Sequence, residues 1–99
     1  MADKKHFFLK LVAARPTFAQ DMTDAERAIM QQHVGYLTDL MNKGIVKAFG
    51  PVLDPAGAFG IGIIEAETEE QVREITVNDP ASGINRYEIY PMIAVLPAK

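Results

Sequence analysis

His33 is the side chain in this sequence that is best suited to proton transfer. An imidazole has an unperturbed pKa of about 6.5, so it can donate or accept a proton near neutral pH. Steps of three and four residues lead from Ile29 through His33 to Leu37, which places His33 on the apolar face of an expected helix. We therefore expect the ring to point inward, either as a core histidine bonded to a backbone carbonyl or as a general acid or base.

Asp79 is the carboxylate that could orient this imidazole. It precedes Pro80, which favours an extended backbone at the start of a loop. One interpretation is an Asp that caps its own turn; the other is a partner that reaches His33 and fixes its tautomer. Ser82 follows closely, but a serine in a Gly/Pro turn usually forms the turn, so no nucleophilic triad is indicated.

Glycines and phenols could complete a site for a ligand. Gly60 and Gly62 are two residues apart, so they share one face of an expected strand and leave it without side chains. That groove could hold a ligand or allow close packing of a helix or a partner subunit. Tyr36, Tyr87 and Tyr90 could orient a polar ring, although aromatic residues at these spacings are more often core residues. The predicted substrate contacts are Tyr36, Gly60, Gly62 and Ser82.

Other kinds of site find little support. His6 and His33 lie far apart, there is no cysteine, and no phosphate-binding glycine loop occurs, so we predict no metal and no cofactor. The order of elements is shared with RNA-recognition motifs. Here, however, Gly57 stands where a basic residue is needed, and Ile61 and Ile64 stand where aromatic residues would stack on bases.

The elements that must position these residues can be read from periodicity and capping signals. Thr23 and Glu26 have the spacing of a capping box, and Gly44 suits the end of the same helix. Thr68 and Gln71 repeat the capping spacing. The expected order is a strand at 6–15, a helix after Thr23, strands at 45–53 and 58–66 joined by a turn at 54–57, a helix ending near Asn78, and a strand at 86–95.

This βαββαβ order predicts an α+β, ferredoxin-like fold, a four-stranded antiparallel sheet with two helices on one face. The segments 7–9 and 59–64 are apolar or neutral on both faces of their strands. A sheet with one solvated face would instead alternate apolar and polar residues. We therefore expect a second copy to cover the bare face, giving a homodimer or higher homo-oligomer.

Composition restricts the class of partner. The chain has 99 residues, 48% of them hydrophobic, and a net charge of −3, which suits a single domain over 1–99. The mild acidity argues against nucleic acid and against an anionic membrane surface. The start of the chain lacks the apolar segment of a signal peptide, and no run approaches 18 apolar residues. We expect a cytoplasmic protein whose partner is a small molecule or a protein.

Several of these residues together resemble the YciI-like (YCII) family over nearly the whole chain. The resemblance rests on His33 within segment 26–37, Gly44, Gly50-Pro51, the strand 60–62, and Asp79-Pro80 followed by Gly83. It implies a dimeric α+β barrel, similar to muconolactone isomerase, with an active site at His33 and Asp79. Most members have no assigned reaction, and one branch is linked to chloride elimination from chlorinated hydroxyquinones. Ala81 departs from the aromatic residue that many members carry there.

The resulting hypothesis is a cofactor-independent enzyme of isomerase or lyase type. Neutral His33 would transfer the proton of a small cyclic or aromatic polar molecule, and Asp79 would orient the imidazole. The alternative is a non-catalytic small-molecule-binding or regulatory module, which needs a pocket but no imidazole within reach of the ligand.

Overall fold

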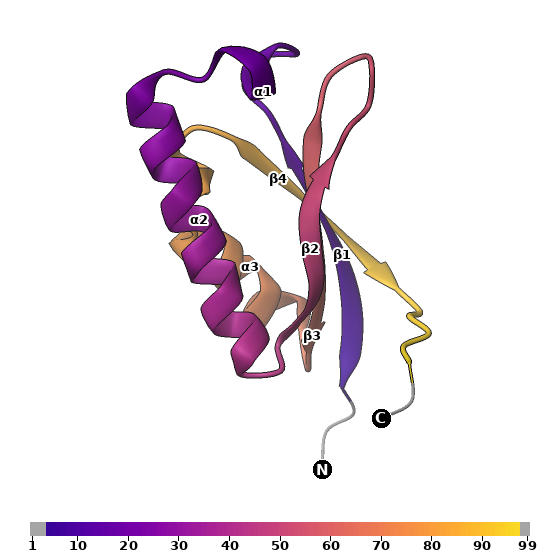
Figure 1. Cartoon of the computed structure of the whole chain (residues 1–99). Helices are drawn as coiled ribbons and strands as arrows, with labels where there is room; N and C mark the ends of the chain where they lie inside the picture. Colours follow the sequence, from indigo (N-terminus) through magenta and orange to yellow (C-terminus); the bar gives the residue numbers. More distant parts are fainter. Residues whose placement is uncertain (1–3, 98–99) are drawn as a thin grey trace.

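The computed structural model describes residues 4–97 and contains one four-stranded sheet with helices against it (Figure 1). The elements in chain order are β1 (Lys5–Val12), α1 (Phe18–Asp21), α2 (Asp24–Asn42), β2 (Val46–Val52), β3 (Phe59–Ala66), α3 (Glu69–Asn78), the 3-10 helix η1 (Pro80–Gly83) and β4 (Arg86–Met92).

The sheet has the strand order β2-β3-β1-β4, with every neighbouring pair antiparallel. Helices α2 and α3 lie on the same side of it, and the other side carries no described element (Figure 1). The predicted ferredoxin-like α+β fold is therefore confirmed. Its two central strands, β1 and β3, lie beneath the helices and form the floor on which the site is built.

The core lies between the sheet and the two long helices. Alternate residues of β1 point to the helices because successive side chains of a strand face opposite ways, and Phe7, Leu9 and Leu11 are buried. The core cluster also contains Leu37, Val46, Ile64, Ala66 and Val72. Leu37 is one turn beyond His33 on α2, so the packing that buries Leu37 also fixes the direction of the histidine.

The ends of α2 follow the sequence signals. The hydroxyl of Thr23 accepts from the N–H of Glu26, and the carboxylate of Glu26 accepts from the N–H of Thr23, which completes the predicted capping box. Gly44 has a φ of +82°, a left-handed conformation that glycine adopts without strain. Because both ends of α2 are fixed, the helix cannot shift along or turn about its axis, and the direction of the His33 side chain is fixed as well.

The second expected capping box is incomplete. Thr68 accepts from the N–H of Gln71, but the side chain of Gln71 accepts from the N–H of Glu67 and not from Thr68. Helix α3 still covers the residues expected of it, from Glu69 to Asn78.

Two strands are shorter than expected. The first, expected at 6–15, ends at Val12, and the last, expected at 86–95, ends at Met92. Met92 pairs with His6, so residues beyond it have almost no neighbouring strand left to bond to. The short elements α1 and η1 were not expected and occupy loops on either side of the site.

No helix among residues 4–97 is long and apolar enough to cross a lipid bilayer. The first three residues, part of the segment behind the cytoplasmic expectation, lie outside the described range.

Candidate functional site

His33 and Asp79 form a direct side-chain pair between α2 and η1. Nδ1 of His33 lies 2.7 Å from Oδ2 and 3.0 Å from Oδ1 of Asp79. Asp79 is 2% exposed and His33 8%, so the pair is almost sealed from bulk solvent. The residues are 46 positions apart in the chain, and the fold brings them together as the sequence hypothesis required.

Asp79 is held by two further donors. The hydroxyl of Tyr87, on β4, donates to Oδ2, and the N–H of Ala81 donates to Oδ1 at 2.9 Å. Asp79 thus caps η1 and also binds His33, so the two alternatives considered for this residue are both realised. Burial acts to raise the pKa of Asp79, but hydrogen bonds from His33, Tyr87 and Ala81 outweigh it and hold the pKa below its ordinary value.

This arrangement sets the tautomer of His33. A carboxylate only accepts hydrogen bonds, so Nδ1 of the imidazole must carry the hydrogen that points to Asp79. In the neutral ring Nε2 is then the acceptor. Nε2 makes no hydrogen bond with residues 4–97 and remains accessible, so it is free to take a proton from a ligand.

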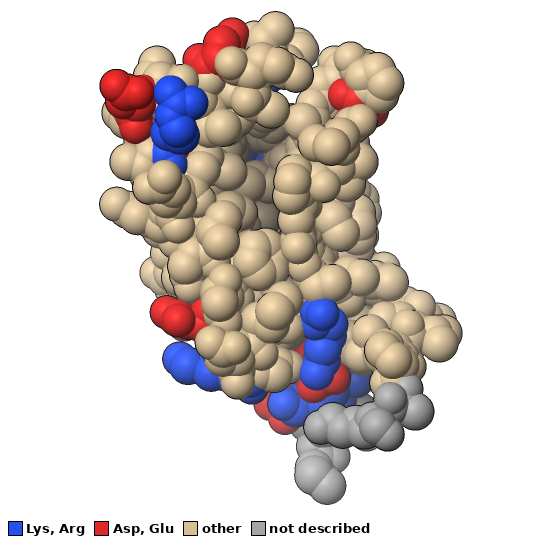
Figure 2. All heavy atoms as spheres, viewed as in Figure 1, with Lys and Arg blue, Asp and Glu red and all other residues tan. Residues whose placement is uncertain are grey.

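A cavity of about 250 Å³ lies beside the pair, bounded by the sheet, α1 and α2. Most of its lining is apolar, including Leu9, Leu37 and Phe49, and the polar lining residues are His33, Asn85 and Tyr87. None of the described residues that line it is Asp, Glu, Lys or Arg. Figure 2 shows charged residues gathered towards the ends of one face, with an uncharged middle that is hollowed between α2 and the β2–β3 hairpin.

The walls hold the imidazole and leave room next to it. The ring of Phe49, on β2, meets the His33 ring edge to face, with centroids 6.5 Å apart. Gly60 and Gly62 line the cavity floor on β3. A Cβ at Gly60 would lie 3.3 Å from Cβ of Leu11, and one at Gly62 would be in ordinary contact with Phe49. Side chains here would reduce the space above the strand.

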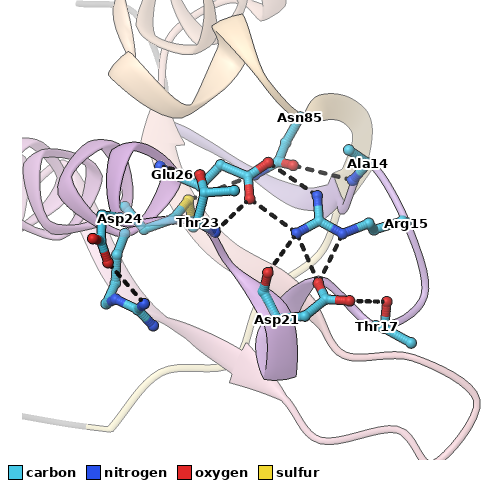
Figure 3. A network of polar contacts seen from close by, with 10 residues as sticks. Ala14, Arg15, Thr17, Asp21, Thr23, Asp24, Glu26 and Asn85 are labelled. Carbon is cyan, nitrogen blue, oxygen red and sulfur yellow. Dashed lines mark hydrogen bonds and ion pairs between the residues drawn. The ribbon is translucent and has the colours of Figure 1, made fainter.

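One end of the cavity is closed by α1, which Arg15 ties to α2 (Figure 3). Arg15 donates to Asp21 at 2.8 Å from Nε and to the Glu26 carboxylate at 3.0 and 2.9 Å from its two terminal nitrogens. The hydrogen bonds that Glu26 accepts from Arg15 and from the N–H of Thr23 lower its pKa to about 2. The network places Phe18 on the cavity lining.

Four of the expected site residues meet at this cavity, and two do not. His33, Gly60 and Gly62 line it, and Asp79 lies directly behind His33. Tyr36 does not line it: its hydroxyl donates to the carbonyl of Ile75 at 2.7 Å and joins α2 to α3. Ser82 is also absent from the lining, and its hydroxyl donates to the carbonyl of Asp79 at 2.9 Å, as a turn-forming serine does.

Sequence reasoning missed two polar residues of the site. Tyr87 was considered only as a phenol that could face substrate, and its bond to Asp79 depends on the register of β4 against β1. Asn85 gave no signal at all, because an asparagine in a Gly-rich turn is ordinary. No group of three or more His, Asp or Glu side chains in residues 4–97 is arranged to hold a metal ion.

Comparison with known proteins agrees with this fold. The family model described as the YCII-related domain matches residues 7–95. A search of curated proteins found no match. Among solved structures, the chain is similar to the 5-chloro-2-hydroxyhydroquinone dehydrochlorinase TftG from Burkholderia phenoliruptrix AC1100 in complex with 2,5-dihydroxybenzoquinone, with a TM-score of 0.64 and 23% identity over 88% of this chain and 93% of that one. It is also similar to the uncharacterized protein TM1266 from Thermotoga maritima, with a TM-score of 0.54 and 11% identity over 92% and 100% of the two chains.

Proposed function

Because this chain belongs to the YCII-related domain family, we propose that it is an enzyme that moves a proton on a small cyclic or aromatic polar molecule. His33 is the proposed general acid and base, and Asp79 is the residue that positions it. The observation that carries the proposal is the contact of 2.7 Å between Nδ1 of His33 and Oδ2 of Asp79 beside an uncharged cavity. The similar dehydrochlorinase, whose structure is a complex with 2,5-dihydroxybenzoquinone, supports a ring as substrate.

The proposed reaction begins with proton transfer to Nε2 of neutral His33. Asp79 stabilises the resulting imidazolium, and the low exposure of the pair strengthens this attraction relative to water. In an isomerisation the imidazolium returns the same proton to another atom of the ring. In an elimination from a chlorinated hydroquinone, the proton of one hydroxyl moves to the carbon that bears chlorine, which gives a ketone. Loss of the proton of a second hydroxyl then forms another C=O bond and a ring C=C bond, while chloride departs with the electron pair of its C–Cl bond. Both balance without an oxidant or a cofactor.

The cavity favours a ligand that is neutral when it binds. A charged carboxylate or phosphate would enter a space where no lining residue of the described chain carries a permanent charge to pair with it. The apolar walls suit the faces of one ring, and the three polar lining residues suit hydroxyl or carbonyl groups at its edge. A hydroxylated ring meets both requirements.

We also propose that the active form is a cytoplasmic homodimer. The sheet face opposite the helices carries Phe8, Ile61 and Ile63, with the paired Lys10 and Glu88 on the same face, and no element among residues 4–97 covers it. Beyond β4, Ile93 and Val95 are also 97% and 96% exposed. A second copy is the occupant with matching apolar chemistry, and its packing would enlarge the limited core of a 99-residue chain.

The function is tested by incubating the protein with hydroxylated ring compounds. We suggest 5-chloro-2-hydroxyhydroquinone for chloride release, and the unchlorinated ring in D2O for exchange of ring protons by NMR. Wild type should accelerate one of these reactions, and His33→Ala should not, although it keeps the fold. Binding without acceleration would support the non-catalytic ligand-binding module. Equal activity of wild type and His33→Ala would refute the assigned role of His33.

A further inference from the structure

Among the described residues that line the cavity, Asn85 carries the one polar group that the proposed proton transfer does not use. Asn85 is half-buried and lies directly before β4, at the end of the cavity near Met30. What it can do follows from the hydrogen bonds that each end of its amide makes.

The amide has a fixed orientation. Its Oδ1 accepts from the N–H of Ala14 at 3.2 Å, which ties the loop after β1 to the residue before β4 (Figure 3). The oxygen is therefore occupied by the backbone, and Nδ2 must point the other way. Nδ2 lies 3.5 Å from Sδ of Met30, a residue that also lines the cavity.

The nitrogen, on a side chain that lines the cavity, therefore has only a weak acceptor, the sulfur of another lining residue. A thioether sulfur accepts hydrogen bonds poorly, and a partly buried N–H gains free energy when it finds an oxygen instead. Met30 precedes His33 by three residues, so the two side chains are neighbours on one face of α2, roughly 5 Å apart along the helix axis. Asn85, Met30 and His33 line the same cavity, so a single ligand in it can contact both the amide and the imidazole.

We propose that Asn85 is a substrate-binding residue whose Nδ2–H group donates a hydrogen bond to a carbonyl oxygen of the substrate. This inference rests on the proposed function and adds a specificity to it: the ring must carry a hydrogen-bond acceptor on the side away from His33. A donor at a carbonyl oxygen also stabilises the negative charge that develops there when a proton is removed from a conjugated position. The site then combines a base at one end with an electrophilic contact at the other.

The test uses pairs of probes that differ only in this acceptor. The 2-, 3- and 4-hydroxyacetophenones carry a carbonyl where the matching ethylphenols carry a methylene. By calorimetry at pH 7, wild type should bind at least one hydroxyacetophenone about three- to tenfold more tightly than its ethylphenol, as expected for one neutral hydrogen bond. Asn85→Asp keeps the acceptor for the N–H of Ala14 but removes the donor, so this preference should disappear.

Two controls separate recognition from structure. Met30→Leu keeps Asn85 and the apolar wall, so the preference should persist. In wild type, the side-chain amide signals of Asn85 should shift with the hydroxyacetophenone and not with the ethylphenol, whereas those of the exposed Asn42 and Asn78 should stay in place. Because the NMR measurement uses only the wild-type protein, its result does not depend on whether the Asn85→Asp variant folds.

Each outcome decides the matter. Equal binding of both probe series by wild type, or a preference that survives in a folded Asn85→Asp variant, would overturn the role of Asn85 and leave the role of His33 intact. Failure of every phenol to bind would overturn both the role of Asn85 and the proposed substrate class. A clear preference in a protein whose turnover is indifferent to His33→Ala would support Asn85 and refute the proposed chemistry.

Discussion

A buried carboxylate is stable as an anion only when donors surround it, and Asp79 has three of them. They come from the imidazole of His33, the phenol of Tyr87 and the N–H of Ala81. Each donor belongs to a different element, α2, β4 and η1. Asp79 therefore joins three parts of the fold as well as orienting the imidazole, so its substitution affects both stability and chemistry.

The lowered pKa of Asp79 predicts an acid-dependent contribution to stability. The folded pKa lies below the unfolded value of about 3.9, so the contribution is full well above that value and is lost as the pH falls through the folded pKa. Asp79→Asn presents one oxygen to three donors and should lower the free energy of unfolding by about 3 kcal/mol at pH 7. Urea unfolding at pH 7, 5 and 3 should show this difference shrink below about pH 4. A difference independent of pH would contradict the ionised state of Asp79.

Tyr87→Phe tests the second side-chain donor. It removes a hydrogen bond to a buried carboxylate and keeps the ring, so the loss should be about 1.5–3 kcal/mol of unfolding free energy at neutral pH. Tyr36→Phe is the matched control, because the Tyr36 hydroxyl donates to a neutral acceptor, the carbonyl of Ile75, and its loss should cost only about 0.5–1.5 kcal/mol. Equal effects of the two variants in urea unfolding would show that Tyr87 does not support Asp79.

The direction of a single side chain could be predicted from the sequence where local spacing or a neighbouring proline determines it. The inward direction of His33 follows from its spacing to Leu37, and the backbone before Pro80 limits where Asp79 can lie. Pairing them also required the family resemblance, because 46 residues separate the two side chains. The partners of Tyr36 could not be read in this way, since facing inward does not distinguish a helix–helix contact from a cavity wall.

At the scale of elements, α1 is the part that local signals did not reveal. It contains four residues and no periodic pattern, and its geometry comes from the Arg15 network and from Phe18, whose ring lies 5.3 Å from the Arg15 guanidinium. By contrast, α2 has a complete capping box and a closing glycine, and its start at Asp24 was predicted accurately. Strands β1 and β4 were overestimated because apolar composition continues beyond the last paired residue.

Arg15→Ala should loosen α1 specifically. The change removes the hydrogen bonds to Asp21 and Glu26, so the amides of residues 18–21 should lose hydrogen-exchange protection while those of α3 keep theirs. Arg73→Ala, which breaks the exposed pair with Glu69 on α3, is the matched control. Unchanged protection in α1 would mean that Phe18 packing alone holds the segment at the cavity.

At the scale of the whole molecule, the strand order was predictable because right-handed connections leave few arrangements for βαββαβ. The cavity was not, since its volume depends on how far α1 and α2 stand from the sheet. The sequence did indicate an apolar bare face, because residues 59–64 do not alternate between polar and apolar side chains.

The proposed dimer predicts a mass of twice 10.9 kDa by sedimentation equilibrium at micromolar concentration. Ile63→Lys puts a charge on the bare sheet face and should shift the protein to monomer or impair folding. Val77→Lys, at a position on α3 that is 74% exposed, should leave the mass unchanged. A folded wild-type monomer that loses no structure on dilution would contradict the dimer.

The proposed chemistry requires that His33 and Asp79 act as one unit in proton transfer. It is tested most directly by a double-mutant cycle on kcat/KM for the ring substrate that wild type turns over, using His33→Ala, Asp79→Asn and the double variant, with Tyr36→Phe as control. We predict that His33→Ala removes turnover, that Asp79→Asn leaves a reduced rate, and that the double variant is no slower than His33→Ala alone. Independent, additive losses, or full activity without His33, would contradict the account.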